Sequence, residues 1–166
     1  MYVQSFAPLG NARATRLVLG TMPGRASLLA RQYYAHPRNA FWYIIQELFG
    51  IPQQFPYPLR VRKLAPTGLA VWDVLAACTR GSSLDSDILP ASAVPNDFAR
   101  FLAAHRHIHT IYFNGTAARQ LFERHVLRGL PPAQQGIARI QLPSTSPTNA
   151  RMSLAEKARA WRVING

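Results

Sequence analysis

The sequence predicts an α/β fold in one domain, residues 1–166: a three-layer sandwich in which helices cover both faces of a four-stranded parallel sheet. Three observations predict it. Short apolar segments alternate with helical patterns along the 166 residues. Each strand candidate is followed by a turn-forming or polar segment. Hydrophobic residues make up 48% of the chain, which is enough for a packed core.

The strand candidates are apolar segments that end abruptly at polar or turn-forming residues. They are expected at residues 16–19, 69–72, 108–113 and 137–142. The segments that follow them are GTMPG, Asp73, Asn114-Gly115 and PSTSP. Because helical crossovers make such strands parallel, these segments should meet at one edge of the sheet. Ligands bind at that edge in open α/β sheets.

Helices are expected where apolar residues recur at helical spacing, at residues 41–48, around 98–102, around 118–122 and from 153 to about 163. Gly50 closes the first, Asn96 is a candidate N-cap of the second, and Ser153 with Glu156 has capping-box spacing. The remaining stretches are expected to be irregular: residues 21–38, the proline-rich residues 51–60 and residues 79–95. A short apolar segment leads from Asp73 to near Cys78.

The net charge is the strongest compositional signal. Nineteen Lys and Arg face seven Asp and Glu, which gives a formal charge of +12. Such an excess favours a polyanionic partner, nucleic acid above all, although a GC-rich genome also raises Arg content. The basic residues are scattered along the chain, so a folded basic face is expected rather than a basic tail.

Several other function classes find no support in the sequence. The single cysteine, Cys78, excludes an internal disulfide and a cysteine-ligated cluster or zinc. His105, His107 and His109 alternate, but no carboxylate lies close, so neither a metal nor a cofactor is expected. GTMPG has neither nucleotide-binding spacing, and no GxSxG elbow occurs. Without an apolar span or a secretory signal, a cytoplasmic monomer is expected.

Three blocks together resemble a known family. They are GTMPG, the block YAHPRNAFW at residues 34–42, and LPSTSP before the last helix. Their combination is similar to the uracil-DNA glycosylase superfamily, from about Leu17 to Trp161. The hypoxanthine-DNA glycosylase branch is the most similar, and the mismatch-specific uracil/thymine glycosylases come next. The resemblance implies the fold of that superfamily and hydrolysis of the N-glycosidic bond of a base flipped out of double-stranded DNA.

The resemblance implies a catalytic residue in the second block. Mismatch-specific relatives carry a water-activating Asn in the first motif, but the aligned residue here is Met22, whose thioether orients water poorly. The likeness to the hypoxanthine branch implies that Asn39 takes this role. The alternative is that Asn39 is only a helix N-cap before Phe41. His36 is expected to support this loop rather than to transfer a proton.

The base pocket is expected at the strand ends. Tyr34 aligns with a ring that stacks on the flipped base, or it is a core aromatic. Asp73 can accept from N1–H of hypoxanthine and repel the bare N1 of adenine, or it serves as an N-cap or ion-pair partner. Asn114 lines the pocket or forms a turn. Backbone N–H groups in the first motif are expected to hold a base carbonyl; its pocket residues are Gly20, Thr21, Met22 and Pro23.

DNA contacts are expected in the last loop, where Ser144, Thr145 and Ser146 lie between two prolines. Arg38 and Arg151 are candidate phosphate contacts, although exposed arginines need no special role. The two lysines, Lys63 and Lys157, lie outside the three blocks, so no amine is expected for a lyase reaction.

The sequence thus predicts a monofunctional DNA glycosylase for deaminated bases, with hypoxanthine preferred. Alternatives are a mismatch-specific uracil/thymine glycosylase, a non-catalytic DNA-binding module of the same fold, and a hydrolase acting on RNA or nucleotides. Polar residues at positions 39 and 73 favour an enzyme, because binding alone requires neither.

Overall fold

The computed structural model describes residues 1–166 and contains a central sheet of four parallel strands in the order β3-β2-β6-β7. These strands are β2 (Arg16–Gly20), β3 (Leu69–Asp73), β6 (Thr110–Asn114) and β7 (Ala138–Leu142). The predicted α/β class is confirmed, and the four strands lie where the apolar segments indicated.

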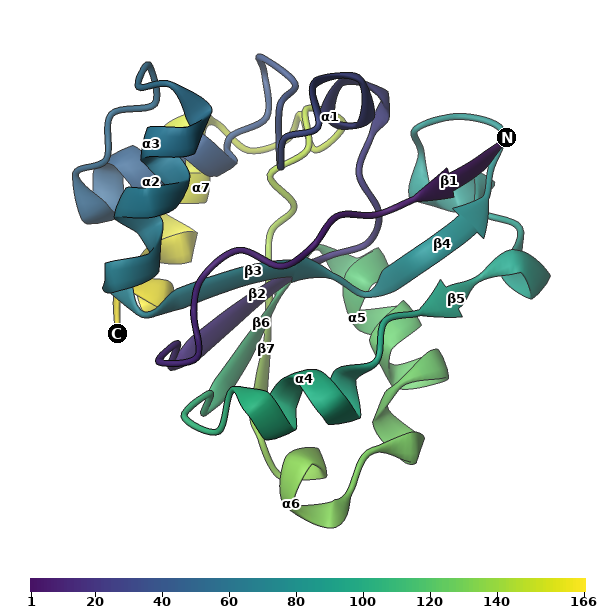
Figure 1. The fold of residues 1–166 in the computed structure, drawn as a ribbon. Coiled ribbons are helices and arrows are strands. Elements are labelled where there is room, and N and C mark those ends of the chain that lie inside the picture. The colour runs from purple at the N-terminus through teal and green to yellow at the C-terminus, as the bar shows by residue number, and fades with distance from the viewer.

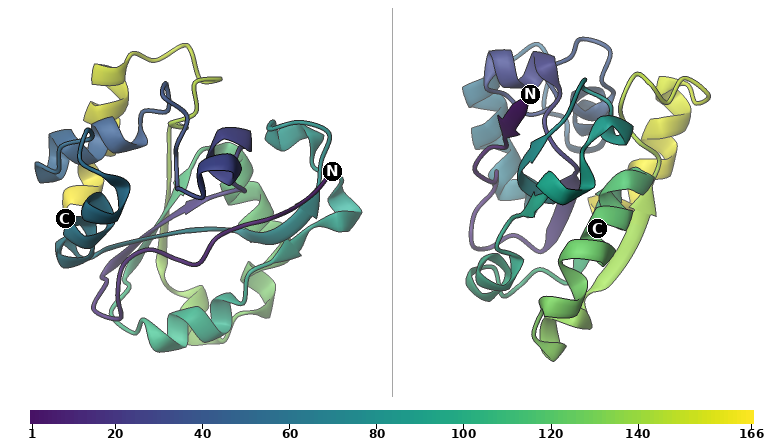
Figure 2. Two further views of the ribbon diagram at one scale, coloured as in Figure 1. Left: turned by 45° about the horizontal axis from the view of Figure 1, so that its top comes forward. Right: turned by 90° about the vertical axis from the view of Figure 1, so that its right-hand side faces the viewer.

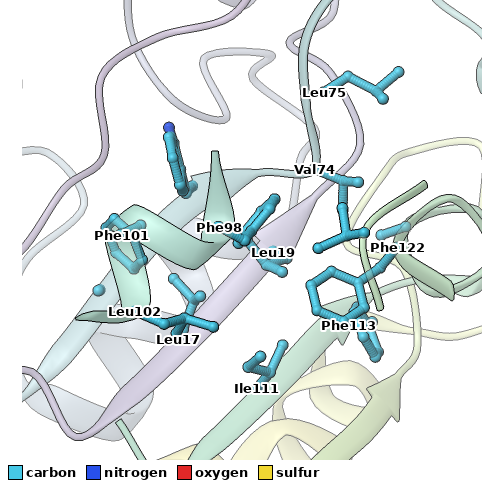
Figure 3. Close-up of a cluster of buried hydrophobic side chains, with 14 of the residues drawn as sticks. Leu17, Leu19, Val74, Leu75, Phe98, Phe101, Leu102, Ile111, Phe113 and Phe122 are labelled. Carbon is cyan, nitrogen blue, oxygen red and sulfur yellow. The ribbon is translucent and has the colours of Figure 1, made fainter. Parts of the chain in front are cut away.

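Helices cover both faces of this sheet (Figure 1). Leu17 and Leu19 of β2 face a core shared with Phe98 and Phe122, as Figure 3 shows, whereas Val18 faces the opposite core. The first core lies under α4 (Phe98–Ala104) and α5 (Thr116–His125), with the short α6 (Pro132–Gln135) nearby. The second lies under α2 (Phe41–Phe49), α3 (Tyr57–Leu64) and α7 (Leu154–Ala160). The alternation of side chains therefore produces the three layers.

A second sheet was not predicted from the sequence. It is antiparallel, has the order β1-β4-β5, and consists of β1 (Tyr2–Gln4), β4 (Leu75–Thr79) and β5 (Val94–Pro95). The apolar segment that ends near Cys78 is its central strand. Because only Val74 separates β3 from β4, the second sheet begins directly beside the end of the central one.

Two helices lie in stretches that were expected to be irregular. The helix α3 begins just after Pro56 and has Pro58 in its first turn, where a helix needs no N–H donor, so the prolines start this helix rather than prevent it. The helix α1 (Arg25–Ala30) lies inside the expected loop of residues 21–38. No helix of the structure is long and apolar enough to cross a membrane.

The helix caps agree with the sequence in one case and differ in another. The predicted capping box of α7 is confirmed, with Ser153 and Glu156 each accepting from the other's backbone N–H. Asn96 does not cap α4. Asp97 does, and the Asn96 side chain donates instead to the backbone carbonyl of Asp73 at 2.7 Å. In Figure 1 and in the left view of Figure 2, the yellow helix α7 lies beside α2.

Candidate active site

The carboxyl ends of β2, β3 and β6 meet the loop after β7 around a cavity of about 480 Å³. That volume lies within the usual range for small-ligand sites, roughly 300–1,000 Å³. The structure brings almost all of the predicted site residues to this cavity: Gly20, Thr21, Met22, Pro23, Tyr34, Arg38, Asn39, Asp73, Asn114, Ser144, Thr145 and Ser146. Arg151 is exposed and does not line it.

The block HPRNAFW forms a tight turn at the edge of the cavity. The Asn39 N–H donates to the His36 carbonyl at 2.9 Å, and the Arg38 N–H donates to His36 Nδ1 at 3.0 Å. His36 therefore supports the turn, as expected. Asn39 Oδ1 accepts from the Phe41 N–H at 2.9 Å, which leaves its Nδ2 group available. The alternative that Asn39 is the N-cap of α2 is wrong, because the N-cap is Ala40 and Asn39 lies one residue before it, where its side chain closes an Asx turn. Buried Phe41 and Trp42 anchor the turn in the core below.

Asn114 and Thr145 clamp the last loop onto the sheet. Asn114 Nδ2 donates to Thr145 Oγ1 and its Oδ1 accepts from the Thr145 N–H, each at 2.9 Å. The Thr145 carbonyl in turn accepts from the Ala40 N–H at 2.9 Å. Asn114 thus lines the cavity, but its side-chain amide forms hydrogen bonds to the loop. Thr145 is 0% exposed, so its hydroxyl is inside the loop rather than on the DNA-facing surface.

The other side of the same loop rests on α7 and the residues after it. Trp161 Nε1 donates to the Pro143 carbonyl at 2.9 Å, and Lys157 Nζ donates to the Ser146 carbonyl at 3.2 Å. The expectation that Lys157 lies away from the blocks is therefore wrong. Lys157 is buried against the last loop, and this burial lowers the pKa of its amine. Helical spacing placed it in α7 without indicating which face of α7 covers the loop.

The first motif has its side chains turned to protein and its amides free. Met22 is buried in the core cluster that contains Trp72 and Phe98. The N–H groups of Thr21 and Met22 donate to no other backbone group. The Thr21 hydroxyl donates to Asp85 Oδ2 at 3.2 Å. An anion or carbonyl at this edge of the cavity can therefore still be bound by backbone donors.

Asp85 lines the cavity and Arg80 supports the first motif beside it, and neither was recognised in the sequence. Arg80 is buried, donates through Nη2 to the Pro23 carbonyl, and has no partner for Nη1. Asp85 lines the cavity, and removal of its carboxyl from water raises its pKa. Both come from residues 79–95, which carry neither a regular period nor a motif, so no sequence signal pointed to them.

Asp73 is a buried carboxyl without a partner. It ends β3, is 4% exposed, and its Oδ2 has no hydrogen-bond partner. Burial and, secondarily, the charge of Asp85 raise its pKa from 3.8 to about 7, while Arg80 opposes this shift. The structure shows neither an N-cap nor an ion pair at Asp73, since the one side-chain ion pair joins Arg119 to Glu123.

Tyr34 packs with its ring against the core and its hydroxyl at the strand ends. Its ring stacks on Phe41, with a centroid separation of 4.3 Å and an interplanar angle of 29°. Its hydroxyl is shielded from water and has no partner at hydrogen-bonding geometry. Burial and then the charge of Asp73 raise its pKa, while the neighbouring Asn114 side chain opposes this shift. Its φ of 55° is left-handed, a conformation that costs a non-glycine residue about 1 kcal/mol or more.

Comparison with known proteins places these features in a family. The sequence profile of the Uracil DNA glycosylase superfamily matches residues 7–165. The chain belongs to this superfamily. The match therefore includes every residue of the cavity described above.

Two relatives in this superfamily are named hypoxanthine DNA glycosylase. The one from Methanosarcina acetivorans is 32% identical over 149 residues, covering 89% of this chain and 88% of its own. The one from Methanosarcina barkeri is 30% identical over 116 residues, covering 69% and 72%. An NMR structure from M. acetivorans, described as a candidate uracil DNA glycosylase, has a TM-score of 0.79 and 29% identity, with complete coverage of both chains.

Proposed function

We propose that this protein is a monofunctional DNA glycosylase that hydrolyses the N-glycosidic bond of a deaminated base flipped out of double-stranded DNA, with hypoxanthine preferred. One observation carries the proposal: Asn39 is held at the cavity by its turn, with its Nδ2 group and one lone pair of its Oδ1 uncommitted. The names of the two Methanosarcina relatives support the substrate. We propose further that it acts as a cytoplasmic monomer.

In this mechanism Asn39 positions the attacking water over the sugar. Its Oδ1 uses one lone pair for the Phe41 N–H and keeps the second for the water. The turn bond and the catalytic role are therefore compatible, and the turn bond fixes the amide in one orientation. The base departs with negative charge, which the free N–H groups of Thr21 and Met22 can stabilise as preorganised donors.

The last loop and the basic surface bind the DNA backbone. Ser144 and Ser146 are partly exposed at the cavity and present hydroxyls to phosphate, while buried Thr145 holds the loop in place. Arg38, exposed at the rim, adds a phosphate contact, and Arg151 extends the basic surface beyond the cavity. The net charge of +12 supports a polyanionic partner of this kind.

Single-turnover excision assays test the proposal on duplexes that carry one hypoxanthine, uracil, xanthine or mismatched thymine. We expect hypoxanthine to be released fastest. The second candidate, a mismatch-specific uracil/thymine glycosylase, gains if uracil or thymine is released faster. Release of none of these bases would leave a non-catalytic DNA-binding module or a hydrolase acting on RNA or nucleotides.

Two substitutions separate catalysis by Asn39 from support of its turn. Asn39→Ala removes both functions, whereas Asn39→Ser keeps a side-chain oxygen for the Phe41 N–H and removes the amide. If the amide orients water, both variants lose on the order of 10²-fold in rate and keep most of their DNA affinity. A near-normal rate for Asn39→Ser would mean that the residue only holds the turn before α2.

A further inference from the structure

Two unpartnered polar groups converge on one point of the cavity floor. A Cβ added to Gly20 would lie 2.6 Å from Asp73 Oδ1 and 3.0 Å from the Tyr34 hydroxyl. Both Asp73 and Tyr34 line the cavity. The Tyr34 hydroxyl and Asp73 Oδ2, the other oxygen of the same carboxyl, are buried without a partner. An unpaired buried polar group costs about 1–3 kcal/mol, so two side by side indicate a ligand that pairs with both.

The two groups differ in what they offer a ligand. The Tyr34 hydroxyl can donate a hydrogen bond, whereas an ionised Asp73 can only accept one. The complementary ligand therefore presents an acceptor next to a donor. The edge of an oxo base has this arrangement, a carbonyl beside a ring N–H. An amino base reverses it, with an amino group beside a bare ring nitrogen.

We propose that Tyr34 and Asp73 form one recognition pair, in which the Tyr34 hydroxyl donates to the carbonyl of the flipped base and Asp73 accepts from the adjacent ring N–H. The pair rests on the glycosylase function proposed above and assigns its selectivity for oxo over amino bases to these two side chains. Guanine presents the same carbonyl and ring N–H as hypoxanthine, so we expect the cavity to reject guanine through its additional amino group.

The arrangement around the pair explains how it is held. Phe41 stacks on one face of the Tyr34 ring. This stack positions the ring and so fixes the direction of the Tyr34 hydroxyl. Gly20 leaves the space between the two groups open because it has no Cβ. The sequence left two roles open for Tyr34, a ring stacked on the base or a core aromatic. In the structure its ring stacks on Phe41, and its hydroxyl lies near Asp73 at the strand ends.

The charged and titratable groups around Asp73 set the conditions of the test. Asp85 and Arg80 face it from the segment after β4, and Tyr33 and Tyr34 face it from the loop after α1. Burial and the charge of Asp85, opposed by the charge of Arg80, leave the pKa of Asp73 at about 7, and both tyrosines are neutral. The assay is therefore run at about pH 8.5, where Asp73 is mostly ionised and accepts only.

The test compares single-turnover excision of hypoxanthine and of unsubstituted purine from the same position in one duplex. Unsubstituted purine lacks both the carbonyl and the ring N–H. Tyr34→Phe keeps the stack on Phe41 and loses the donor, so hypoxanthine release should slow about 10-fold while purine release is unchanged. Asp73→Asn can donate to the bare nitrogen, so purine release should rise about 10-fold or more.

Further variants separate recognition by this pair from misfolding and from stacking alone. Tyr43→Phe removes a hydroxyl from α2 outside the cavity and should leave the hypoxanthine-to-purine ratio unchanged. A faster reaction on purine cannot result from misfolding. If wild type releases hypoxanthine but Tyr34→Phe and Asp73→Asn keep its ratio, the pair is refuted and the glycosylase proposal stands. If Tyr34→Phe is normal and Tyr34→Leu slows both bases equally, the ring acts only by stacking and the pair is again refuted.

Discussion

Substitution of Asp73 by Asn should change how the stability of the protein depends on pH. The pKa of Asp73 rises from 3.8 in an exposed chain to about 7 in the folded protein. Between these values the folded state keeps a proton that the unfolded state has lost. The free energy of unfolding therefore decreases as pH rises from about 4 to 7 and then levels off.

The size of the effect follows from the shift. Each pKa unit corresponds to about 1.4 kcal/mol, so a shift of about three units makes ionised Asp73 cost up to about 4 kcal/mol at pH 8. Asn cannot ionise, and any cost of its unpaired amide is the same at every pH. The difference in stability between Asp73→Asn and wild type should therefore shift in favour of the variant by up to about 4 kcal/mol between pH 4 and pH 8.

Urea unfolding of both proteins at several pH values from 4 to 8 measures this difference. Glu47→Gln removes an exposed carboxyl from α2 and is the matched control, for which we expect a curve parallel to wild type. Parallel curves for Asp73→Asn and wild type would refute the reasoning, because they would mean that Asp73 titrates alike in the folded and unfolded states.

Other predictions concern DNA binding, the absence of a lyase reaction, the space beside Gly20 and the contribution of Asn114 to stability. Affinity for undamaged duplex should fall steeply with salt, since the charge of +12 favours release of condensed counterions; titrations at several salt concentrations measure the slope, and a flat one would remove this argument. Borohydride should trap no protein–DNA adduct, because Lys63 is exposed on α3 and the Lys157 amine is committed to the Ser146 carbonyl. Gly20→Ala should lower the rate of hypoxanthine excision, whereas Gly81→Ala, which has open space around its Cβ, should not. Asn114→Ala should lower the melting temperature by several degrees, because the backbone N–H and the side-chain hydroxyl of Thr145 both lose their hydrogen bonds.

The spacing of apolar residues and the turn-forming or polar residues at the strand ends predicted the central sheet and most of the cavity. Because side chains alternate between the two faces of a strand, a continuous apolar run such as residues 17–19 indicates burial on both faces of the sheet. The carboxyl ends of neighbouring parallel strands also lie at the same edge of the sheet. That constraint alone brought Asp73 and Asn114 together from positions far apart in the chain. The capping box of α7 is equally local and was equally visible.

The features that the sequence did not reveal depend on tertiary approach. Whether Pro56 and Pro58 start a helix or break one depends on what packs against α3. Arg80 follows β4, a strand of the second sheet that the sequence did not predict, and from there it donates to the Pro23 carbonyl of the first motif. The side of α7 that carries Lys157 faces the last loop, and the spacing of residues within α7 does not indicate this contact.

Hydrogen-bond satisfaction separates two kinds of polar group in this cavity. Asn114, Thr145 and His36 have protein partners, and each holds a loop in place. The Tyr34 hydroxyl and Asp73 Oδ2 have none, although both are buried. Sequence types alone do not distinguish these groups, since an Asn at one strand end and an Asp at the next look equally suited to read a base. Because an unpaired buried group lowers stability, it is the unsatisfied set that we expect to contact substrate, and the satisfied set to fix the geometry in which it does so.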